Sequence, residues 1–259
     1  MDIKTCHFLQ TFDRTAKFNM DFDKAMMESL GRNRLEQLWR VYDWNPAAIS
    51  LGKNQKIEQV INLEHTSKAG LDIVIRPTGG RAIYHKNDIC ISLAGLLSLD
   101  EVGGSSAQVI YNKFAHMLAR FFDNLNIKTS LARGTRLDQE FRTGKGKLPC
   151  FLSATPYELV SQERKKLAGI ALFVGKDRYL VQSSVTNQPL EIEDFMFFRG
   201  LRSSDELLAS VTSLTQEAGR IVNREEICRA LLKALSESAG CNVITLEESE
   251  IRGGEKKVR

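Results

Sequence analysis

Cys150 is the cysteine whose surroundings best suit covalent chemistry. It lies where a basic, glycine-containing segment meets a strand-like stretch, and Lys145 and Lys147 stand just before it. Nearby positive charge lowers the pKa of a thiol and raises the fraction of thiolate, which is the nucleophilic form. A lone cysteine is usually a small apolar side chain. That ordinary role accounts for the four other cysteines: Cys6, Cys90, Cys228 and Cys241.

A second candidate segment spans residues 76–85, with the sequence RPTGGRAIYH. Gly79 and Gly80 permit a positive φ and carry no side chain that would block an approaching ligand. The flanking arginines, Arg76 and Arg81, can serve a carboxylate, a phosphate or a carrier phosphopantetheine. An ordinary hairpin turn with solvated arginines accounts for the pattern about as well, because Gly-Gly is a common turn pair.

Lys166 stands two residues before the small pair Ala168 and Gly169. A lysine at this spacing can project into a pocket whose floor is nearly bare backbone. The competing interpretation is a solvated run of charges, Glu163 to Lys166, in a hairpin turn. His85 taken alone is more typical of a structural, hydrogen-bonded histidine than of a catalytic one.

The spacing of apolar and capping residues predicts the helices around these motifs. We expect helices over Asn19–Leu30, Val60–Ala69 (closed by Gly70), Ser105–Leu125, and a last one that opens with the capping box of Asn223 and Glu226 and stops at Gly240.

Extended patterns predict the strands, and the segment Thr135–Pro149 is expected to be a surface loop. Asp72–Arg76 is expected to be a buried strand that lies in one sheet with the strands that follow it. The strand-like runs are Trp39–Ser50, Asp72–Arg76, Arg81–His85, Ile89–Ala94, Tyr157–Val160, Leu167–Val174 and Tyr179–Val185. Together the elements predict an α+β (α/β) fold with a mixed, largely antiparallel central sheet flanked by helices.

Composition limits the class of protein. The 259 residues are 42% hydrophobic and 26% charged, which is typical of a globular chain and excludes disordered and disulfide-scaffold classes. No apolar run approaches the ~20 residues that span a bilayer, and the polar N-terminus argues against secretion. The net charge of +4 is too small to indicate a nucleic-acid binder. The five scattered cysteines contain no CxxC pair, so a structural zinc site is not expected. We expect a cytoplasmic protein.

Residues 76–85, followed about 80 residues later by Lys166-Leu-Ala-Gly-Ile-Ala171, resemble the paired signature of lipoate/biotin protein ligases and their acyltransferase relatives. Further motifs match the same family: Asn19-Met-Asp-x-Asp23, Trp44-x-Pro46, Ser50-Leu-Gly52 with Gln55, and Tyr157-Glu158. The resemblance covers roughly residues 10 to 190. It implies a catalytic domain over residues 1–190, with residues 191–259 as its C-terminal helical extension.

Within this family, Cys150-Phe151 shortly before Tyr157-Glu158 resembles the cysteine-dependent octanoyltransferase branch. The Gly-Arg-Gly-Arg loop of biotin ligases is absent. About seventy residues follow the last motif strand, which is tight for the accessory domain that many lipoate ligases carry. The chain departs from the family pattern at Pro77 and at Gln182-Ser183-Ser184, where relatives typically have His-Gly-Ser or His-Gly-Thr.

The resemblance implies transfer of an octanoyl group from acyl carrier protein to a lysine of a lipoyl-accepting domain. Cys150 would be the nucleophile, and Lys166 would donate hydrogen bonds to the carbonyl oxygen. Substrate-binding residues implied by the motifs are Arg76, Gly79, Gly80, Arg81, His85, Gly169 and Ala171. The expected reaction requires no metal and no other cofactor, because the thioester is already activated.

Two alternatives remain open at this point. One is a lipoate–protein ligase that uses ATP and magnesium to make an acyl-adenylate. The other is a noncatalytic binder of carrier proteins or lipoyl domains, which the replacement of the family histidine by Gln182 makes plausible. Neither nucleic acid nor a membrane is an expected partner.

Overall fold

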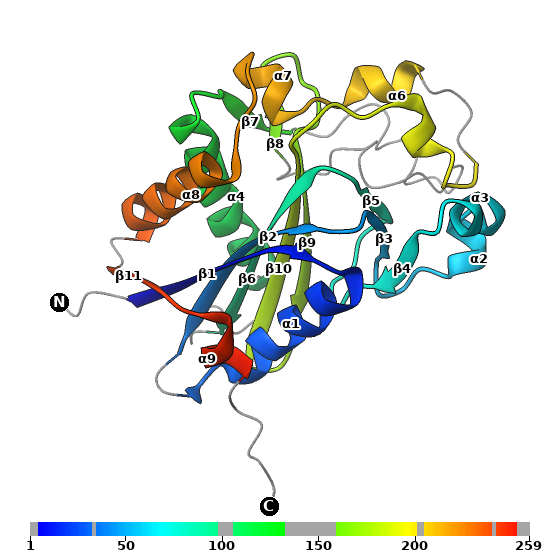
Figure 1. Ribbon diagram of the computed structural model, residues 1–259. Helices are drawn as coiled ribbons and strands as arrows, with labels where there is room; N and C mark the ends of the chain where they lie inside the picture. Colours follow the sequence, from blue (N-terminus) through cyan, green and yellow to red (C-terminus); the bar gives the residue numbers. More distant parts are fainter. Residues whose placement is uncertain are drawn as a thin grey trace, which may run out of the picture.

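A six-stranded sheet forms the centre of the computed structural model, which describes residues 5–32, 35–97, 106–132, 159–200, 205–239 and 242–252 (Figure 1). In spatial order the strands are β11 (Asn242–Thr245), β1 (Thr5–Arg14), β2 (Gln37–Trp44), β6 (Asp88–Leu96), β10 (Arg178–Thr186) and β9 (Ala168–Val174). β1 is parallel to β2 and β11, and the other three neighbouring pairs are antiparallel. The predicted mixed, largely antiparallel sheet is confirmed.

Helix α1 (Ala16–Ser29) connects β1 to β2 and so makes these two strands parallel. It begins three residues before the predicted start, because the Thr15 side chain caps it by accepting a hydrogen bond from the Phe18 amide at 3.3 Å. Of the four apolar residues that the helical pattern indicates as contacts, Met20, Met26 and Leu30 are buried and Met27 is partly buried.

The side chains of β2 alternate between the two faces of the sheet, as in any strand. Trp39 and Val41 face α4 (Ser106–Asn124) and α8 (Arg224–Ala239), whereas Leu38 packs with residues of α1 on the opposite face. Helix α9 (Glu248–Arg252) contacts α1 on that second face (Figure 1). Each face of the sheet therefore has its own core.

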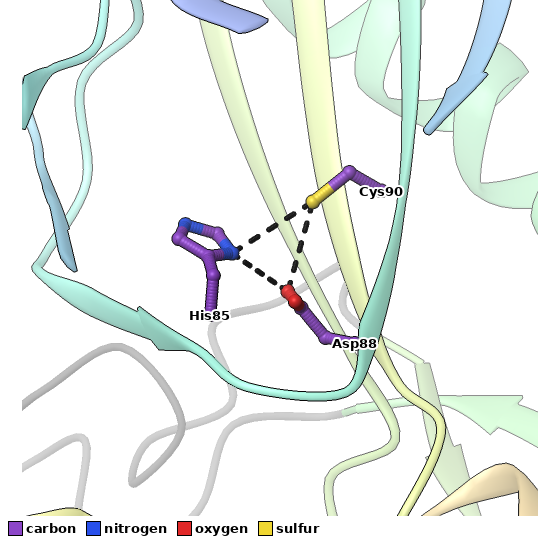
Figure 2. Close-up of side chains that lie close together, drawn as sticks. All are labelled: His85, Asp88 and Cys90. Carbon is purple, nitrogen blue, oxygen red and sulfur yellow. Dashed lines mark hydrogen bonds and ion pairs between the residues drawn. The ribbon is translucent and has the colours of Figure 1, made fainter. Parts of the chain in front are cut away.

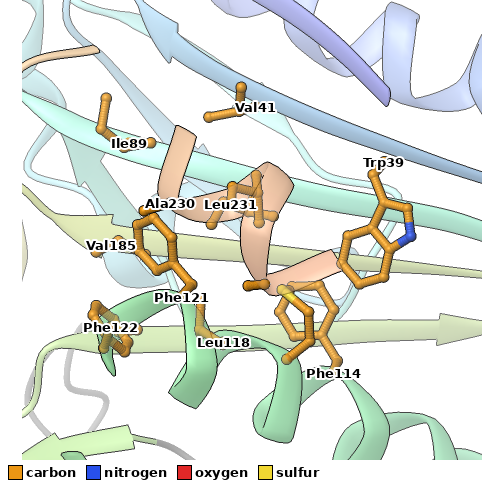
Figure 3. Close-up of a cluster of buried hydrophobic side chains, with 14 of the residues drawn as sticks. Trp39, Val41, Ile89, Phe114, Leu118, Phe121, Phe122, Val185, Ala230 and Leu231 are labelled. Carbon is orange, nitrogen blue, oxygen red and sulfur yellow. The ribbon is translucent and has the colours of Figure 1, made fainter. Parts of the chain in front are cut away.

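The larger core lies between the sheet and α4, the helix predicted over Ser105–Leu125 (Figure 3). Phe114, Leu118 and Phe121 are completely buried there. The Trp39 and Phe114 rings stack with their centroids 5.6 Å apart. Replacing an aromatic side chain in such a core by Ala typically costs about 3–5 kcal/mol.

Helix α8 begins at the predicted cap. The Asn223 side chain accepts a hydrogen bond from the Glu226 amide at 2.9 Å. The Glu226 carboxylate pairs with Arg220. Ile227, Leu231 and Leu235 are buried against the sheet, as their spacing predicts.

The prediction that residues 72–94 form neighbouring strands of one sheet is wrong. β4 (Asp72–Ile75) and β5 (Ile83–His85) both pair with β3 (Ala48–Leu51) in a separate three-stranded sheet, and β6 lies in the central sheet. β4 is an edge strand and is not fully buried, because only β3 pairs with it; Ile75 is 49% exposed. The helix predicted over Val60–Ala69 is two short helices, α2 (Ile57–Val60) and α3 (Leu63–Lys68).

The remaining elements lie toward the top of the view in Figure 1. They are β7 (Thr129–Leu131), β8 (Leu159–Ser161), the 3-10 helix η4 (Ile192–Phe195), α6 (Asp205–Ser210) and α7 (Leu214–Ala218). The C-terminal extension contains helices and also strand β11 of the central sheet. The predicted loop Thr135–Pro149 lies outside the described residues. Among the described helices, none is long and apolar enough to cross a membrane.

Candidate active site

Four of the predicted substrate-binding residues line one small cavity between the three-stranded sheet and strands β9 and β10. They are Arg76, His85, Gly169 and Ala171. The cavity has a volume of about 20 Å³, and its other lining residues are Tyr42, Trp44, Ile83, Cys90, Ile170, Gln182, Ser183 and Ser184. Segments that are some 80 residues apart in the chain therefore meet at one site.

The Arg76 side chain is buried and holds the turn that follows it. Its Nη1 donates to the Ser50 backbone carbonyl at 3.0 Å and to Ser50 Oγ at 2.8 Å. Its Nη2 donates to the carbonyl oxygens of Gly79 and Arg81, each at 2.9 Å. In this structure Arg76 shapes the turn, and its contact with a substrate anion stays a prediction.

The two glycines of the turn differ in what surrounds them. Gly80 has a φ of +88°, and a Cβ placed there would lie 3.3 Å from Arg76 Nη2. Gly79 has open space where its side chain would be. Gly52 packs against the same turn so closely that a Cβ would lie 2.0 Å from the Gly80 carbonyl oxygen. Glycine is thus required for backbone conformation at Gly80 and for close approach at Gly52.

Gln182 joins the glycine turn to helix α1. Thr78 Oγ1 donates to Gln182 Oε1 at 2.6 Å, and Gln182 Nε2 donates to Asp23 Oδ2 at 2.6 Å. Gln182, which departs from the family pattern, therefore makes hydrogen bonds through both the oxygen and the nitrogen of its side-chain amide. All three residues lie in the quoted family motifs, but the motifs did not indicate that Thr78 and Asp23 would be the partners of Gln182.

A buried ion pair fixes Asp23 in turn. Arg40 Nη1 lies 2.8 Å from Asp23 Oδ1, and both side chains are completely buried. Tyr42 donates a hydrogen bond to Asp23 Oδ2 at 3.2 Å. Burial, together with the negative charge of Asp23, raises the pKa of Tyr42 well above its usual value, so this hydroxyl stays protonated.

His85 lies between a hydroxyl and a carboxylate. Its Nε2 is 2.6 Å from Ser50 Oγ, and its Nδ1 is 2.7 Å from Asp88 Oδ2. Its ring stacks on Trp44 with the centroids 3.9 Å apart. These contacts fit the structural role that the sequence favoured. His85 also lines the cavity, and its contact with substrate stays a prediction.

Among the described residues, four that the sequence predicted do not line this cavity: Gly79, Gly80, Arg81 and Lys166. Lys166 is 3% exposed, and its backbone is held between Val160 of β8 and residues 210–212. Arg81 is partly exposed, and its carbonyl binds Arg76. Cys150 lies outside the described residues, as do Phe151 and Tyr157-Glu158.

Comparison with known proteins decides the family. The profile of the lipoyl protein ligase A/B catalytic domain matches residues 15–236. The chain belongs to this family. The match includes every predicted site residue, from Arg76 to Ala171.

Similar sequences and structures agree with this assignment. The chain is 28% identical to "Octanoyltransferase LipM" of Kyrpidia tusciae over 96% of this chain and 93% of that protein. It is 27% identical to the protein of the same name from Brevibacillus brevis over 97% and 94%. A bipartite lipoate protein ligase from Thermoplasma acidophilum has the same fold, with a TM-score of 0.73 at 16% identity over 96% of this chain and 90% of that chain. The predicted lipoate-ligase-like fold is confirmed.

Proposed function

We propose that this member of the family is an octanoyltransferase that moves an octanoyl group from acyl carrier protein to a lysine of a lipoyl-accepting domain. The observation that carries the proposal is sequence similarity over nearly the whole chain to proteins named octanoyltransferase. The family motifs that line the cavity support it, since Gly169 and Ala171 present little more than backbone to an acyl chain. Cytoplasmic location is part of the same proposal.

The proposed reaction passes through Cys150. Its thiolate attacks the carbonyl carbon of the thioester, and the carrier thiol leaves with a proton, giving an acyl-enzyme thioester. The neutral amine of the acceptor lysine then attacks that thioester. An amide forms, the amine loses a proton, and the Cys150 thiol is regenerated. Lys166 donates a hydrogen bond to the carbonyl oxygen as negative charge develops on it.

Loading of the acyl group requires the cavity to widen. A volume of about 20 Å³ has room for about one water molecule, and an eight-carbon chain needs several times that volume. The turn has open space next to Gly79, where a side chain would lie. Ile83 lines the cavity, as His85 does. We propose that the octanoyl chain enters between this turn and β9, and that apolar side chains of the wall shift to admit it.

Mixing the enzyme with octanoyl carrier protein, without acceptor, tests the proposal. Intact-mass measurement should show enzyme plus one octanoyl group, and hydroxylamine should release it as a thioester. Cys150→Ser should lose the adduct and the transfer, because a serine hydroxyl is scarcely ionised at neutral pH. Cys228→Ser, at a buried cysteine on α8, is the matched control and should keep both. An adduct that survives in Cys150→Ser would contradict the assignment of the nucleophile.

Two further mixtures separate the alternatives. A lipoate–protein ligase would modify the acceptor domain with lipoate, ATP and magnesium in the absence of any carrier protein. A noncatalytic binder would form complexes but transfer no acyl group at any enzyme concentration. We expect the octanoyl group to pass from octanoyl carrier protein to the acceptor domain in a mixture that contains neither ATP nor metal.

A further inference from the structure

Three potential metal ligands converge in the interior, beside the cavity of about 20 Å³ (Figure 2). They are Nδ1 of His85, at the end of β5, and Oδ2 of Asp88 and Sγ of Cys90, both on β6. Cys90 Sγ lies 3.6 Å from Asp88 Oδ2 and 3.8 Å from His85 Nδ1. All three side chains are at least 96% buried.

These separations suit a single ion. Tetrahedral zinc has Zn–N bonds of about 2.0 Å and Zn–S bonds of about 2.3 Å, which place its ligand atoms about 3.3–3.7 Å apart. Both distances from Cys90 Sγ are close to that range. Only the 2.7 Å between His85 Nδ1 and Asp88 Oδ2 is shorter, because the two atoms share a hydrogen bond that an ion would replace.

The atoms around the cluster hold each ligand in a binding orientation. Ser50 Oγ is 2.6 Å from His85 Nε2 and orients the ring; an ion at Nδ1 would replace the hydrogen bond to Asp88, with the ring proton then on Nε2. Trp44 Nε1 donates to Cys90 Sγ at 3.2 Å, while burial raises the pKa of this thiol well above its usual value, so an ion has to displace its proton. Ser184 Oγ donates to Asp88 Oδ2 at 2.6 Å. Such outer partners fix the orientation of metal ligands in proteins generally.

One buried atom of the cluster lacks a partner. Asp88 Oδ1 makes no hydrogen bond to any residue that the structure describes, although Asp88 is only 4% exposed. A buried carboxylate oxygen without a donor is costly and calls for a cation or a water molecule. Asp88 also borders a second, polar cavity of about 400 Å³.

We propose that His85, Asp88 and Cys90 form a binding site for one thiophilic divalent transition-metal ion, of which Zn²⁺ is the type. Imidazole, carboxylate and thiolate are all zinc ligands, and three protein ligands leave a fourth position open. His85 and Cys90 also line the cavity of about 20 Å³. The thiol of Cys90 passes its proton to solvent when the metal–sulfur bond forms.

The site adds a way to regulate the enzyme and plays no part in the transfer itself. Because the ion and the acyl chain would share one cavity, zinc should slow formation of the acyl-enzyme, and this consequence rests on the proposed function. Removal of the ion by a chelator should restore the rate. The metal-binding experiment below uses no acyl donor, so its failure is distinguishable from a failure of the proposed function.

Titration of the full-length protein with Co²⁺ tests the site directly. We expect one Co²⁺ per chain and a thiolate-to-cobalt charge-transfer absorption in the near ultraviolet. Cys90→Ser should abolish that absorption, and Asp88→Asn should weaken binding by about 100-fold or more, since loss of outer partners alone costs 10–100-fold. Cys228→Ser is the matched control at another buried cysteine and should keep the spectrum unchanged.

A charge-transfer band that survives in Cys90→Ser, or no band at stoichiometric Co²⁺, would overturn the proposal. X-ray absorption of the zinc-loaded wild-type protein provides a check that needs no folded variant. It should give one sulfur ligand at about 2.3 Å with nitrogen and oxygen ligands at about 2.0–2.2 Å. A shell without sulfur, or with more than one sulfur, would also rule out this site.

Discussion

Thr78 and Gln182 are 104 residues apart in the chain, and the Thr78 hydroxyl donates to Gln182 Oε1 at 2.6 Å. This hydrogen bond ties the glycine turn of the small sheet to β10 of the central sheet. Gln182 passes the connection on to Asp23 of α1, at 2.6 Å. One wall of the cavity of about 20 Å³ thus includes Gln182, whose hydrogen bonds join three parts of the fold.

Thr78→Val should lower the free energy of unfolding by about 1–3 kcal/mol, because it leaves Gln182 Oε1 buried without a donor. Valine has nearly the same shape, so lost packing adds little. Urea unfolding measures the change. Thr5→Val is the control at an exposed position and should stay within about ±0.5 kcal/mol. An unchanged unfolding free energy in Thr78→Val would show that the bond contributes nothing.

The glycines around the turn should differ in their tolerance of alanine. Gly80→Ala should cost about 1–2 kcal/mol, since it places a side chain on a residue with a φ of +88°. Gly52→Ala should cost more, because its Cβ would overlap the Gly80 carbonyl oxygen. Gly79→Ala meets open space and should stay within about ±0.5 kcal/mol. Equal losses of stability in all three variants, measured by thermal or urea unfolding, would contradict this account.

Lys166→Ala should fold and should lower turnover by on the order of a hundredfold, as loss of one oxyanion donor typically does. Lys165→Ala is the neighbouring control. Lys165 pairs with the exposed Glu163 at 2.8 Å, and such a surface ion pair contributes only about 0–1 kcal/mol. Steady-state transfer assays compare the two variants. Near-normal turnover in folded Lys166→Ala would remove this lysine from the mechanism.

Cys228 should make stability depend on pH in the alkaline range. Burial raises the pKa of its thiol from the ordinary value of 9.0 to about 11. The unfolded chain therefore loses this proton first as the pH rises. The contribution of Cys228 is fully present below pH 9 and is lost between about pH 9 and 11, at a cost on the order of 2 kcal/mol.

Urea unfolding of the wild type and of Cys228→Ala across pH 8 to 11 measures this contribution. The difference between their unfolding free energies should change with pH over that window, because alanine has no proton to lose. If the difference between the two unfolding free energies stays constant from pH 8 to 11, the raised pKa of Cys228 is contradicted.

The sequence alone predicted much of the local structure, and it predicted the family. Helix α4 follows directly from apolar residues at three- and four-residue spacing, and Asn223 marked the start of α8. The paired motifs at 76–85 and 166–171 identified the family that the profile match bears out. Such features depend on residues close together in the chain, whose spacing is visible in the sequence itself.

Only the tertiary structure decided which strands share a sheet and which side chains share a cavity. β5 and β6 are separated by two residues yet lie in different sheets, because β5 pairs with β3 and β6 with β2 and β10. Cys90 looked like an ordinary apolar side chain in the sequence, but the fold places it beside His85 and Asp88. Strand pairing and side-chain convergence arise from contacts between distant segments, and no local pattern encodes the partner of such a contact.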